Sequence, residues 1–386
     1  MITKFGALYA GHIDLDKVGF DAPAVNDREF SRQELARGYS KAEAIAKTAD
    51  ARGFDSLWMA EHHFQPEGYE VIPNLLMMGL HLCHITKNLK IGCGFNIVPT
   101  WHPLRLAEDY ALVDHLTKGR VIFGLARGYH TREVETFGQP LLDQDANREV
   151  FEEQVDIMFK AFNQKSFSHK GRHYELPAKV PYRGYDVEEI TLVPRPRTLP
   201  VETWQPIVSA SDRGMRFMAK HGVKGMIGGG SVLKGAADDV VQKWRKIQEE
   251  ENGIVAPAGT DLMIGTFMHM ADSEEQAIEE MRPYYEENLK MFGPLTGMFT
   301  YSGEQLRLLS NPATAREAGM PSLEEAIEAN GWLVGTPAMV TSKVKAMEKA
   351  MPGLEGLVLN FMMSTPEKTI CAQLNRFADE VMPAFR

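Results

Sequence analysis

Residues 53–64 read Gly-Phe-Asp-Ser-Leu-Trp-Met-Ala-Glu-His-His-Phe. The stretch opens with turn residues, continues through the apolar run Asp55–Ala60 and ends in charged and imidazole side chains. A short apolar run between turn signals is typical of a strand that is buried on both faces in a parallel sheet. The same order of turn, apolar run and polar end returns at residues 118–128, and a helical pattern precedes each of the two segments.

Eight segments of this kind alternate with amphipathic helices along the chain. We expect strands at residues 4–9, 55–60, 90–99, 120–126, 206–210, 223–227, 262–270 and 357–361, and helices at 34–52, 104–116, 148–162, 215–221, 338–350 and 375–381. The alternation predicts an α/β fold, a (β/α)8 TIM barrel, with residues 1–386 as a single domain. We interpret two irregular stretches as insertions, about 164–205 after the fourth strand and about 292–333 after the seventh.

The composition narrows the class of partner. The formal net charge is -10, and the basic residues form no run. Nucleic acids and membrane surfaces attract clustered positive charge, so we expect no nucleic acid and no membrane partner, but a small-molecule substrate. No stretch approaches the ~20 apolar residues of a membrane span. The three cysteines lack CxxC spacing, which fits a reducing compartment, and we expect a cytoplasmic location.

Reactive side chains of a (β/α)8 barrel collect at the carboxyl ends of its strands. One expected strand ends in His62 and His63. Adjacent residues of an extended strand point to opposite faces, so only one imidazole can enter the barrel mouth, and we expect no metal site from this pair. A single histidine there could move protons near neutral pH. The alternative is a structural histidine bonded to a neighbouring backbone group, which is the more common role of a lone histidine.

Arg127, Ser209, Ser211 and Gly214 form a candidate anion site. Arg127 follows an apolar strand, and its guanidinium offers a fork of donors that suits phosphate or carboxylate. The two serines and Gly214 precede an expected helix, whose free backbone N–H groups could bind the same anion. The alternative is a serine N-cap beside a surface arginine. No GxGxxG or GxxxxGK[ST] motif stands at a strand–helix junction, so neither a Rossmann nor a P-loop site is indicated.

Several motifs, taken in order, resemble the luciferase-like flavin monooxygenases, the family that includes the bacterial luciferase α subunit. The motifs are Gly53–Phe64, Pro99–Arg105 with Ala107–Asp109, Leu116–Gly128 and Gly335-Thr336-Pro337. The resemblance runs almost from end to end of the chain. It implies that reduced flavin mononucleotide (FMN) binds at the barrel mouth.

The resemblance also implies roles for individual residues. His62 matches the catalytic histidine that acts in flavin-peroxide chemistry, and Arg127 and Ser211 match residues that hold the flavin phosphate. The step Gly94-Phe95 matches a bulged cis peptide beneath the isoalloxazine ring. The candidate cofactor-binding set is therefore Gly94, Phe95, Arg127, Gly128, Ser209, Ser211 and Gly214.

Two positions depart from the luciferase pattern. Ala126 stands where the luciferases have a reactive cysteine, and Ala210 stands where they have a glutamate beside the phosphate. Both departures argue against light emission. The phosphate-binding residues and the histidine are retained, so the resemblance implies a monooxygenase that does not emit light.

The expected reaction uses reduced FMN and O2 on a small, lipophilic carbonyl compound or a related substrate. A separate NAD(P)H:flavin reductase would supply the reduced flavin, because no second nicotinamide-binding domain is visible, and the resemblance favours a homodimer. One alternative is an oxidoreductase that depends on the deazaflavin F420, since relatives with this barrel use that cofactor. Another is a non-catalytic flavin-binding subunit, against which the retention of His62 and Arg127 argues.

Overall fold

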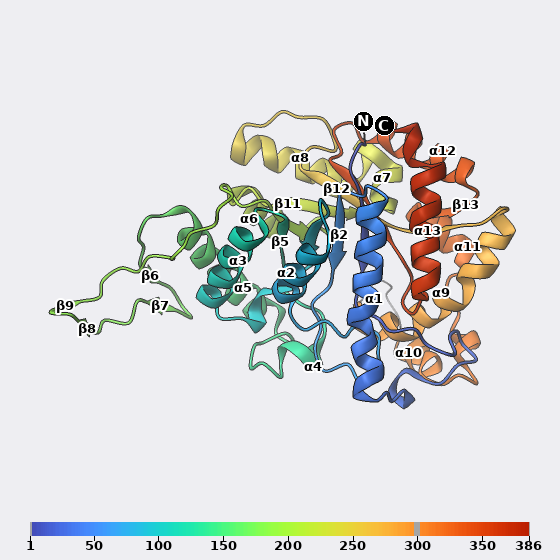
Figure 1. The fold of residues 1–386 in the computed structure, drawn as a ribbon, viewed down its shortest axis with the longest axis horizontal. Coiled ribbons are helices and arrows are strands. Elements are labelled where there is room, and N and C mark those ends of the chain that lie inside the picture. Colours follow the sequence, from blue (N-terminus) through green and yellow to red (C-terminus); the bar gives the residue numbers. More distant parts are fainter. Residues whose placement is uncertain (1, 297–301, 386) are drawn as a thin grey trace.

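The structure is a computed structural model that describes residues 2–296 and 302–385. Eight parallel strands close into a barrel (Figure 1), in the order β1 (Phe5–Tyr9), β2 (Ser56–Met59), β3 (Lys90–Cys93), β5 (Val121–Ala126), β10 (Thr203–Pro206), β11 (Lys224–Gly228), β12 (Leu262–Met270) and β14 (Gly356–Asn360). β14 pairs with β1 and β5 pairs with β10, so no edge remains between them. The predicted TIM barrel is confirmed.

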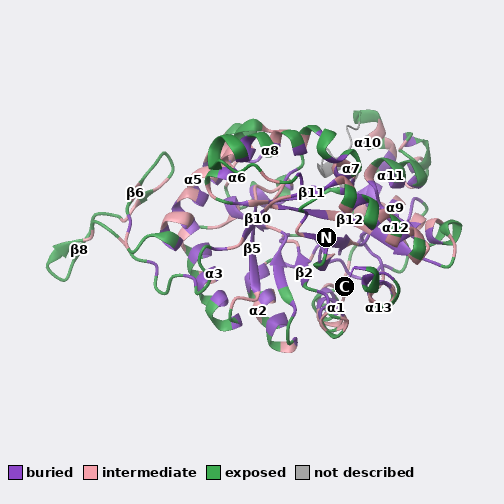
Figure 2. Ribbon diagram, turned by 90° about the horizontal axis from the view of Figure 1, so that it is seen from above, coloured by how far each residue is buried: buried purple, intermediate pink, exposed green. Residues whose placement is uncertain are grey.

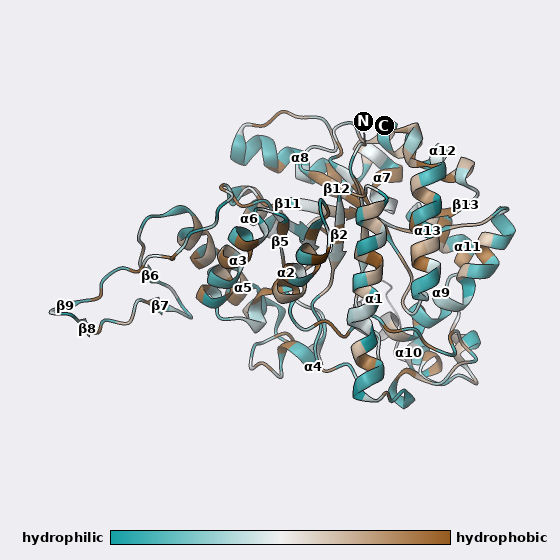
Figure 3. Cartoon of the chain, in the orientation of Figure 1, coloured by the Kyte–Doolittle hydropathy of each residue, from teal (hydrophilic) through white to brown (hydrophobic). Residues whose placement is uncertain are grey.

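Helices surround the barrel. They include α1 (Arg32–Ala51), α2 (Leu75–Ile85), α3 (Pro103–Thr117), α5 (Gln144–Asn163), α6 (Asp212–Lys220), α8 (Asp239–Asn252), α9 (Glu274–Thr296), α12 (Pro337–Ala350) and α13 (Glu367–Glu380). Figure 2 shows buried residues concentrated in the strands and exposed residues on the outer sides of the helices. Polar and apolar residues are both present along α1 and α13 (Figure 3), as expected for helices with one face against a core.

The barrel interior is filled by side chains that alternate with the outward-facing ones. Trp58 and Trp204 are nearly fully buried there, with ring centroids 6.3 Å apart. Glycine makes room for them, because a Cβ on Gly92 would lie 2.3 Å from the Trp58 ring. The outward-facing neighbours Leu57 and Met59 pack into the main core under the helices. The barrel is thus a packed core whose open end is lined by loops.

Two predicted strands have different bounds in the structure. The third, expected at 90–99, is interrupted after Cys93 by a cis peptide between Gly94 and Phe95, and continues as β4 (Asn96–Ile97). The fifth, expected at 206–210, is β10 at 203–206, because Thr203 and Trp204 make the pairings to β5 and β11. The chain leaves the sheet after Ile207, whose N–H still donates to Met226 O at 2.9 Å, and Val208 is 87% exposed.

The last helix also differs from its predicted bounds. It was expected at 375–381, but α13 begins eight residues earlier, at Glu367, after the N-cap residue Pro366. Its buried face includes Ile370, Leu374 and Phe377 at helical spacing. No helix was expected at the positions of α2, α8 and α9.

The region after α5 forms two antiparallel hairpins, β6 (His169–Lys170) with β7 (Glu175–Leu176) and β8 (Pro181–Tyr182) with β9 (Tyr185–Asp186). They project away from the barrel (Figures 1 and 2). The predicted insertion at 164–205 overlaps β10, so its expected end was wrong and the hairpin region stops before Thr203.

In the second predicted insertion, 292–333, the described residues continue α9 to Thr296 and then form α10 (Gly303–Leu309) and α11 (Leu323–Asn330). Residues 297–301 lie outside the described part. β13 (Leu333–Gly335) pairs with β12, and Trp332 is buried against Phe267 and Tyr285. Among the described residues, no helix combines the length and apolar character that crossing a bilayer would require.

Candidate active site

The predicted site residues lie at one end of the barrel. His62 follows β2, Gly94 follows β3, Arg127 follows β5, and Ser209 and Ser211 follow β10. Because all four strands are parallel, their carboxyl ends open on the same mouth. The structure therefore brings every predicted site residue to this end of the molecule.

His62 is buried and has a partner on each ring nitrogen. Its Nδ1 lies 3.1 and 3.2 Å from the two carboxylate oxygens of Glu133, which is on the short helix α4 (Thr131–Val134). Its Nε2 lies 3.1 Å from the Tyr129 hydroxyl and 3.1 Å from Glu70 Oε1. Tyr129 in turn donates to Glu70 Oε1 at 3.2 Å. The imidazole is therefore held between two carboxylates.

The two carboxylates are fixed by further hydrogen bonds. Gln65 Nε2 donates to Glu70 Oε2 at 2.8 Å and to Glu133 Oε1 at 3.1 Å. The backbone N–H of His63 donates to Glu133 Oε1 at 2.9 Å. Because Gln65 contacts both acids, the loop after β2 sets the position of Glu70 relative to Glu133. The side chains around His62 thus form one connected network.

The carboxylates and imidazoles of this network shift one another's pKa values. Burial lowers the pKa of His62, but the carboxylates of Glu70 and Glu133 outweigh burial and raise the pKa to about 10. Burial raises the pKa of Glu70, but His62 and His130 together hold it well below its usual range. The arrangement is that of an imidazolium between two carboxylates, which satisfies charges that would be costly to bury singly.

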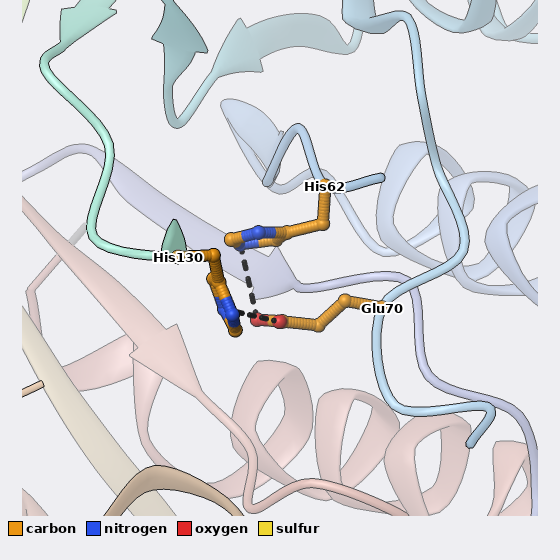
Figure 4. Close-up of side chains that lie close together, drawn as sticks. All are labelled: His62, Glu70 and His130. Atoms are coloured by element: carbon orange, nitrogen blue, oxygen red, sulfur yellow. Dashed lines mark ion pairs between the residues drawn. The ribbon is translucent and has the colours of Figure 1, made fainter. Parts of the chain in front are cut away.

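His130 completes the cluster. Its Nε2 lies 3.1 Å from Glu70 Oε2 but has no hydrogen-bond partner, although the residue is only 3% exposed. Figure 4 shows the rings of His62 and His130 converging on the carboxylate of Glu70. The possible ligand atoms of these three residues all lie within 4.8 Å of one another. This close approach of two imidazoles and a carboxylate could hold either a proton or a metal ion.

His63 has a separate set of partners. Its Nε2 lies 3.0 Å from Glu61 Oε1, and Glu61 also accepts from the Trp101 indole at 2.8 Å and from the backbone of Ile97 at 3.1 Å. Glu61 is fully buried. The imidazole rings of the adjacent histidines therefore belong to different networks.

Arg127 lies on a neighbouring part of the mouth, against α5. Its Nη1 donates to Asn147 Oδ1 at 3.2 Å and to Gln144 Oε1 at 3.4 Å, both of which are neutral acceptors. Burial lowers the pKa of the Arg127 guanidinium, and the nearby positive charge of Arg148 lowers it further. Arg148 lies 3.9 Å from the carboxylate of Glu152, whereas the side-chain partners of Arg127 are neutral. The guanidinium of Arg127 therefore remains suited to an anion.

The first turn of α6 adds backbone donors to this region. Ser211 is the N-cap residue and its hydroxyl accepts from Gly214 N at 3.3 Å, while its own N–H donates to Ser209 O at 2.9 Å. A Cβ on Gly214 would lie 3.3 Å from Nη1 of Arg148. Arg148 therefore lies close to both the N-terminus of α6 and Arg127. The serine N-cap that the sequence analysis weighed as an alternative is present.

The predicted backbone features are also present. The Gly94–Phe95 peptide is cis. Gly128 has φ of +84°, and a Cβ there would lie 2.7 Å from a methyl carbon of Val134, so a larger residue would be both strained and crowded.

Several residues of the site were not assigned a role from the sequence. Tyr129 and His130 were visible as part of the polar end of a strand, directly after Arg127 and Gly128. Glu70, Glu133 and Arg148 gave no comparable signal, because they lie on a loop and on helices where acidic and basic residues are common. Only their approach in space distinguishes them.

A family model described as luciferase-like monooxygenase matches residues 17–352. Since this is most of the chain, the protein belongs to the luciferase-like monooxygenase family. The resemblance that the motifs indicated is thereby confirmed.

Curated relatives cover the chain to different extents. The alkanal monooxygenase alpha chain of the Kryptophanaron alfredi symbiont is 32% identical over 34% of this chain and 36% of its own length. The uncharacterised protein y4vJ of Sinorhizobium fredii is 32% identical over 39% of this chain and 44% of its own. This chain thus matches less than two thirds of either relative. The oxygenase component of flavin-dependent trigonelline monooxygenase from Acinetobacter baylyi is 25% identical over 93% of both chains.

Solved structures share the fold. The oxygenating constituent of 3,6-diketocamphane monooxygenase from a Pseudomonas putida plasmid, in complex with FMN, superposes with a TM-score of 0.72 at 18% identity over 99% of both chains. An F420-dependent secondary alcohol dehydrogenase superposes with a TM-score of 0.68 at 17% identity over the whole of both chains. At these identities the likeness concerns the fold alone.

Proposed function

We propose that this protein is an FMN-dependent monooxygenase that uses reduced FMN and O2 to oxygenate a small lipophilic carbonyl compound or a related organic molecule. One observation carries the proposal: an imidazole clamped by two carboxylates and a cluster of arginines beside a helix N-terminus stand at the same barrel mouth. The family relationship supports the same conclusion.

The residues present fit the phosphate of FMN. Burial and the nearby positive charge of Arg148 lower the pKa of the Arg127 guanidinium. The side-chain hydrogen bonds of Arg127 are to neutral groups. A phosphate would relieve this repulsion, and charge-assisted hydrogen bonds from guanidinium and backbone N–H are among the stronger ones. Arg127, Arg148, Ser211 and the first turn of α6 would bind it, with Ser209 and Gly214 shaping the loop.

The backbone at Gly94, Phe95 and Gly128 would face the ring system of the flavin. The family relationship supports this placement. The space that a Cβ would take at each glycine is filled by protein atoms, of Trp58 at Gly94 and of Val134 and Ile97 at Gly128. When bound, reduced flavin supplies the reactivity toward oxygen, which no protein side chain offers.

His62 would act on protons at its Nε2 atom. Glu133 holds Nδ1 through both of its oxygens, so the ring orientation is fixed and only Nε2 can exchange a proton with a ligand or with Tyr129. Tyr129 and Glu70 then offer a short path by which a proton can leave or return. Burial of the cluster excludes water from this path.

The supply of reduced flavin and the assembly state follow from the same proposal. We infer that a separate NAD(P)H:flavin reductase delivers reduced FMN, because the relative from Acinetobacter is named as an oxygenase component. We also propose that residues 1–386 form a single domain and that the chain assembles as a homodimer.

Coupled turnover tests the function. The chain is mixed with a flavin reductase, NADH, FMN and a panel of aldehydes and ketones, and oxygen consumption is compared with product formation. We expect at least one carbonyl compound to be oxygenated, and His62→Ala to consume oxygen with loss of product. No product from any substrate class, or full coupling in His62→Ala, would contradict the proposal.

F420-dependent hydride transfer is the second candidate. It is supported by the superposition on an F420-dependent alcohol dehydrogenase. Binding of reduced FMN and of reduced F420 to the same preparation separates the two, since the proposal requires tighter binding of FMN. Tighter binding of F420, with substrate turnover under nitrogen, would favour this second candidate.

A further inference from the structure

His62, Glu70 and His130 form a buried cluster of possible metal ligands, and His130 has no role in the proposed reaction. His130 is the clearest sign, because its Nε2 is buried without a hydrogen-bond partner while it lies 3.1 Å from Glu70 Oε2. A buried ring nitrogen at that separation is not aligned for a hydrogen bond with the carboxylate. A buried polar atom without an aligned hydrogen bond is costly, and the contact with Glu70 offsets this cost only in part. The arrangement therefore fits a shared third partner.

We propose that His62, Glu70 and His130 form a binding site for a divalent transition-metal ion of the zinc class, and that the bound ion takes His62 out of the proposed reaction. The set consists of two imidazoles and one carboxylate, which suits zinc-like ions better than Mg²⁺ or Ca²⁺. The effect on turnover rests on the proposed function, whereas the binding itself does not.

The distances fit such an ion. Zinc bonds to nitrogen and oxygen of about 2.0–2.2 Å place the donor atoms of a tetrahedral site roughly 3.3–3.5 Å apart. His62 Nε2 and His130 Nε2 each lie 3.1 Å from an oxygen of Glu70, and all three donors are within 4.8 Å of one another. The three side chains also point toward one another in Figure 4. Only small shifts are needed to place an ion between them.

The outer partners are those that a metal-binding histidine usually has. Glu133 accepts from His62 Nδ1, which directs the lone pair of Nε2 toward the other two residues. Gln65 fixes the carboxylate of Glu70 at 2.8 Å. Charge is compatible with a cation, because Glu70 and Glu133 bring two negative charges into a buried region. A divalent ion that displaces the proton of His62 would balance them with neutral imidazoles.

The ion and the proton would compete for the same atom. A metal on Nε2 of His62 replaces the proton that the proposed reaction requires there, and it also occupies the carboxylate to which Tyr129 donates. Three protein ligands leave a fourth coordination position, which water or a ligand in the barrel mouth can fill. The site would therefore make the enzyme sensitive to free zinc.

Direct binding is measured on the chelator-treated full chain with Zn²⁺ by calorimetry and with Co²⁺ by visible absorption. We expect one tight site per chain. Glu70→Gln and His130→Asn should each weaken Zn²⁺ binding by at least 100-fold, and Glu133→Gln by about 10- to 100-fold, which is typical for loss of a group that orients a ligand. His63→Asn is the matched control and should bind as the wild type, because His63 contacts Glu61 instead.

Thermal unfolding of the same variants keeps the test independent of folding defects. Zn²⁺ should raise the midpoint of the wild type and of His63→Asn, and should leave those of Glu70→Gln and His130→Asn unchanged. Equal Zn²⁺ affinity in the wild type, Glu70→Gln and His130→Asn would overturn the site. So would a loss in His63→Asn as large as the loss in His130→Asn.

Turnover in the presence of Zn²⁺ tests the second half of the proposal. We expect product formation to fall as the tight site fills and to return after a chelator is added. If Zn²⁺ binds as described but turnover continues unchanged, the inhibitory role is overturned and the site stands. If the zinc-free chain shows no turnover with any substrate, the proposed function fails while the binding result is unaffected.

Discussion

The imidazole of His62 shows how neighbouring residues decide the chemistry of one side chain. A lone histidine at a strand end was open to a catalytic or a structural reading, because the sequence does not reveal its neighbours. The structure supplies Glu70 and Glu133, one on each ring nitrogen, and Tyr129 beside Nε2. Glu70 is in a loop eight residues further on and Glu133 is on a helix after β5, so neither could be linked to His62 before folding.

Glu133→Gln tests whether the carboxylate positions His62. Glutamine keeps the size but removes the charge, so the ring is less firmly oriented and product formation should fall by roughly 10- to 100-fold, with little change in the KM for the substrate. Glu67→Gln is the control, since Glu67 lies in the loop after β2, close to Glu70, but pairs with Arg132. The rate of product formation is measured for both variants. Equal rates in Glu133→Gln and Glu67→Gln would show that Glu133 does not position His62.

Lys41 provides a prediction about stability that does not involve the candidate site. Its ammonium group is buried and contacts Asp14 at 2.6 Å and Thr365 O at 2.7 Å. Burial lowers the pKa of Lys41 to about 8, although Asp14 opposes the shift. Between pH 8 and the usual value near 10.5 the unfolded chain binds more protons than the folded one, so this residue's contribution to stability rises with pH.

Comparison with Lys41→Met isolates that contribution. From pH 7 to pH 10 the free energy of unfolding of the wild type should rise relative to Lys41→Met by about 2–3 kcal/mol. Denaturant titrations at both pH values measure the difference. A constant or falling difference would show that Lys41 is not buried as described.

At the scale of elements, strands were easier to predict than their ends. Apolar runs between turn residues located all eight barrel strands, because burial on both faces leaves few polar residues in them. The fifth strand was placed too late because Ile207 and Val208 continue the apolar run, whereas pairing with β5 depends on Thr203 and Trp204. Hydrogen bonding between strands distant in sequence therefore decides bounds that local composition does not.

Close approach of β3 and β5 gives a prediction about one glycine. A Cβ on Gly124 in β5 would lie 1.7 Å from the carbonyl oxygen of Cys93, a backbone atom that cannot move without breaking the barrel. Gly124→Ala should therefore cost at least about 3 kcal/mol of stability or prevent folding. Gly228→Ala is the matched control at the end of β11, where a Cβ would meet nothing within 4 Å.

Denaturant unfolding of the two alanine variants measures this prediction. Gly228→Ala should remain within about 1 kcal/mol of the wild type, since its φ of -78° is open to alanine. A Gly124→Ala variant as stable as Gly228→Ala would contradict the packing of β3 against β5.

In the whole molecule, the barrel could be predicted from the sequence, whereas the structure of its loops could not. The alternation of strands and helices was sufficient for the barrel, because each βα unit repeats the same pattern. The hairpins of residues 169–186 gave no such pattern, since they are short and mostly exposed. The mouth combines both parts: Arg127 and His62 follow predicted strands, whereas Glu70, Glu133 and Arg148 come from segments whose position depends on the complete fold.

We propose that Arg127 and His62 bind the same molecule of reduced FMN at the barrel mouth. Anaerobic titration with reduced FMN and with reduced riboflavin, which lacks the phosphate, tests it in the wild type and in Arg127→Met. We expect Arg127→Met to weaken the binding of reduced FMN by roughly 10- to 100-fold, the loss expected for a charge-assisted hydrogen bond, and to leave the binding of reduced riboflavin unchanged. Equal affinity of the two proteins for reduced FMN, or no binding by the wild type, would contradict it.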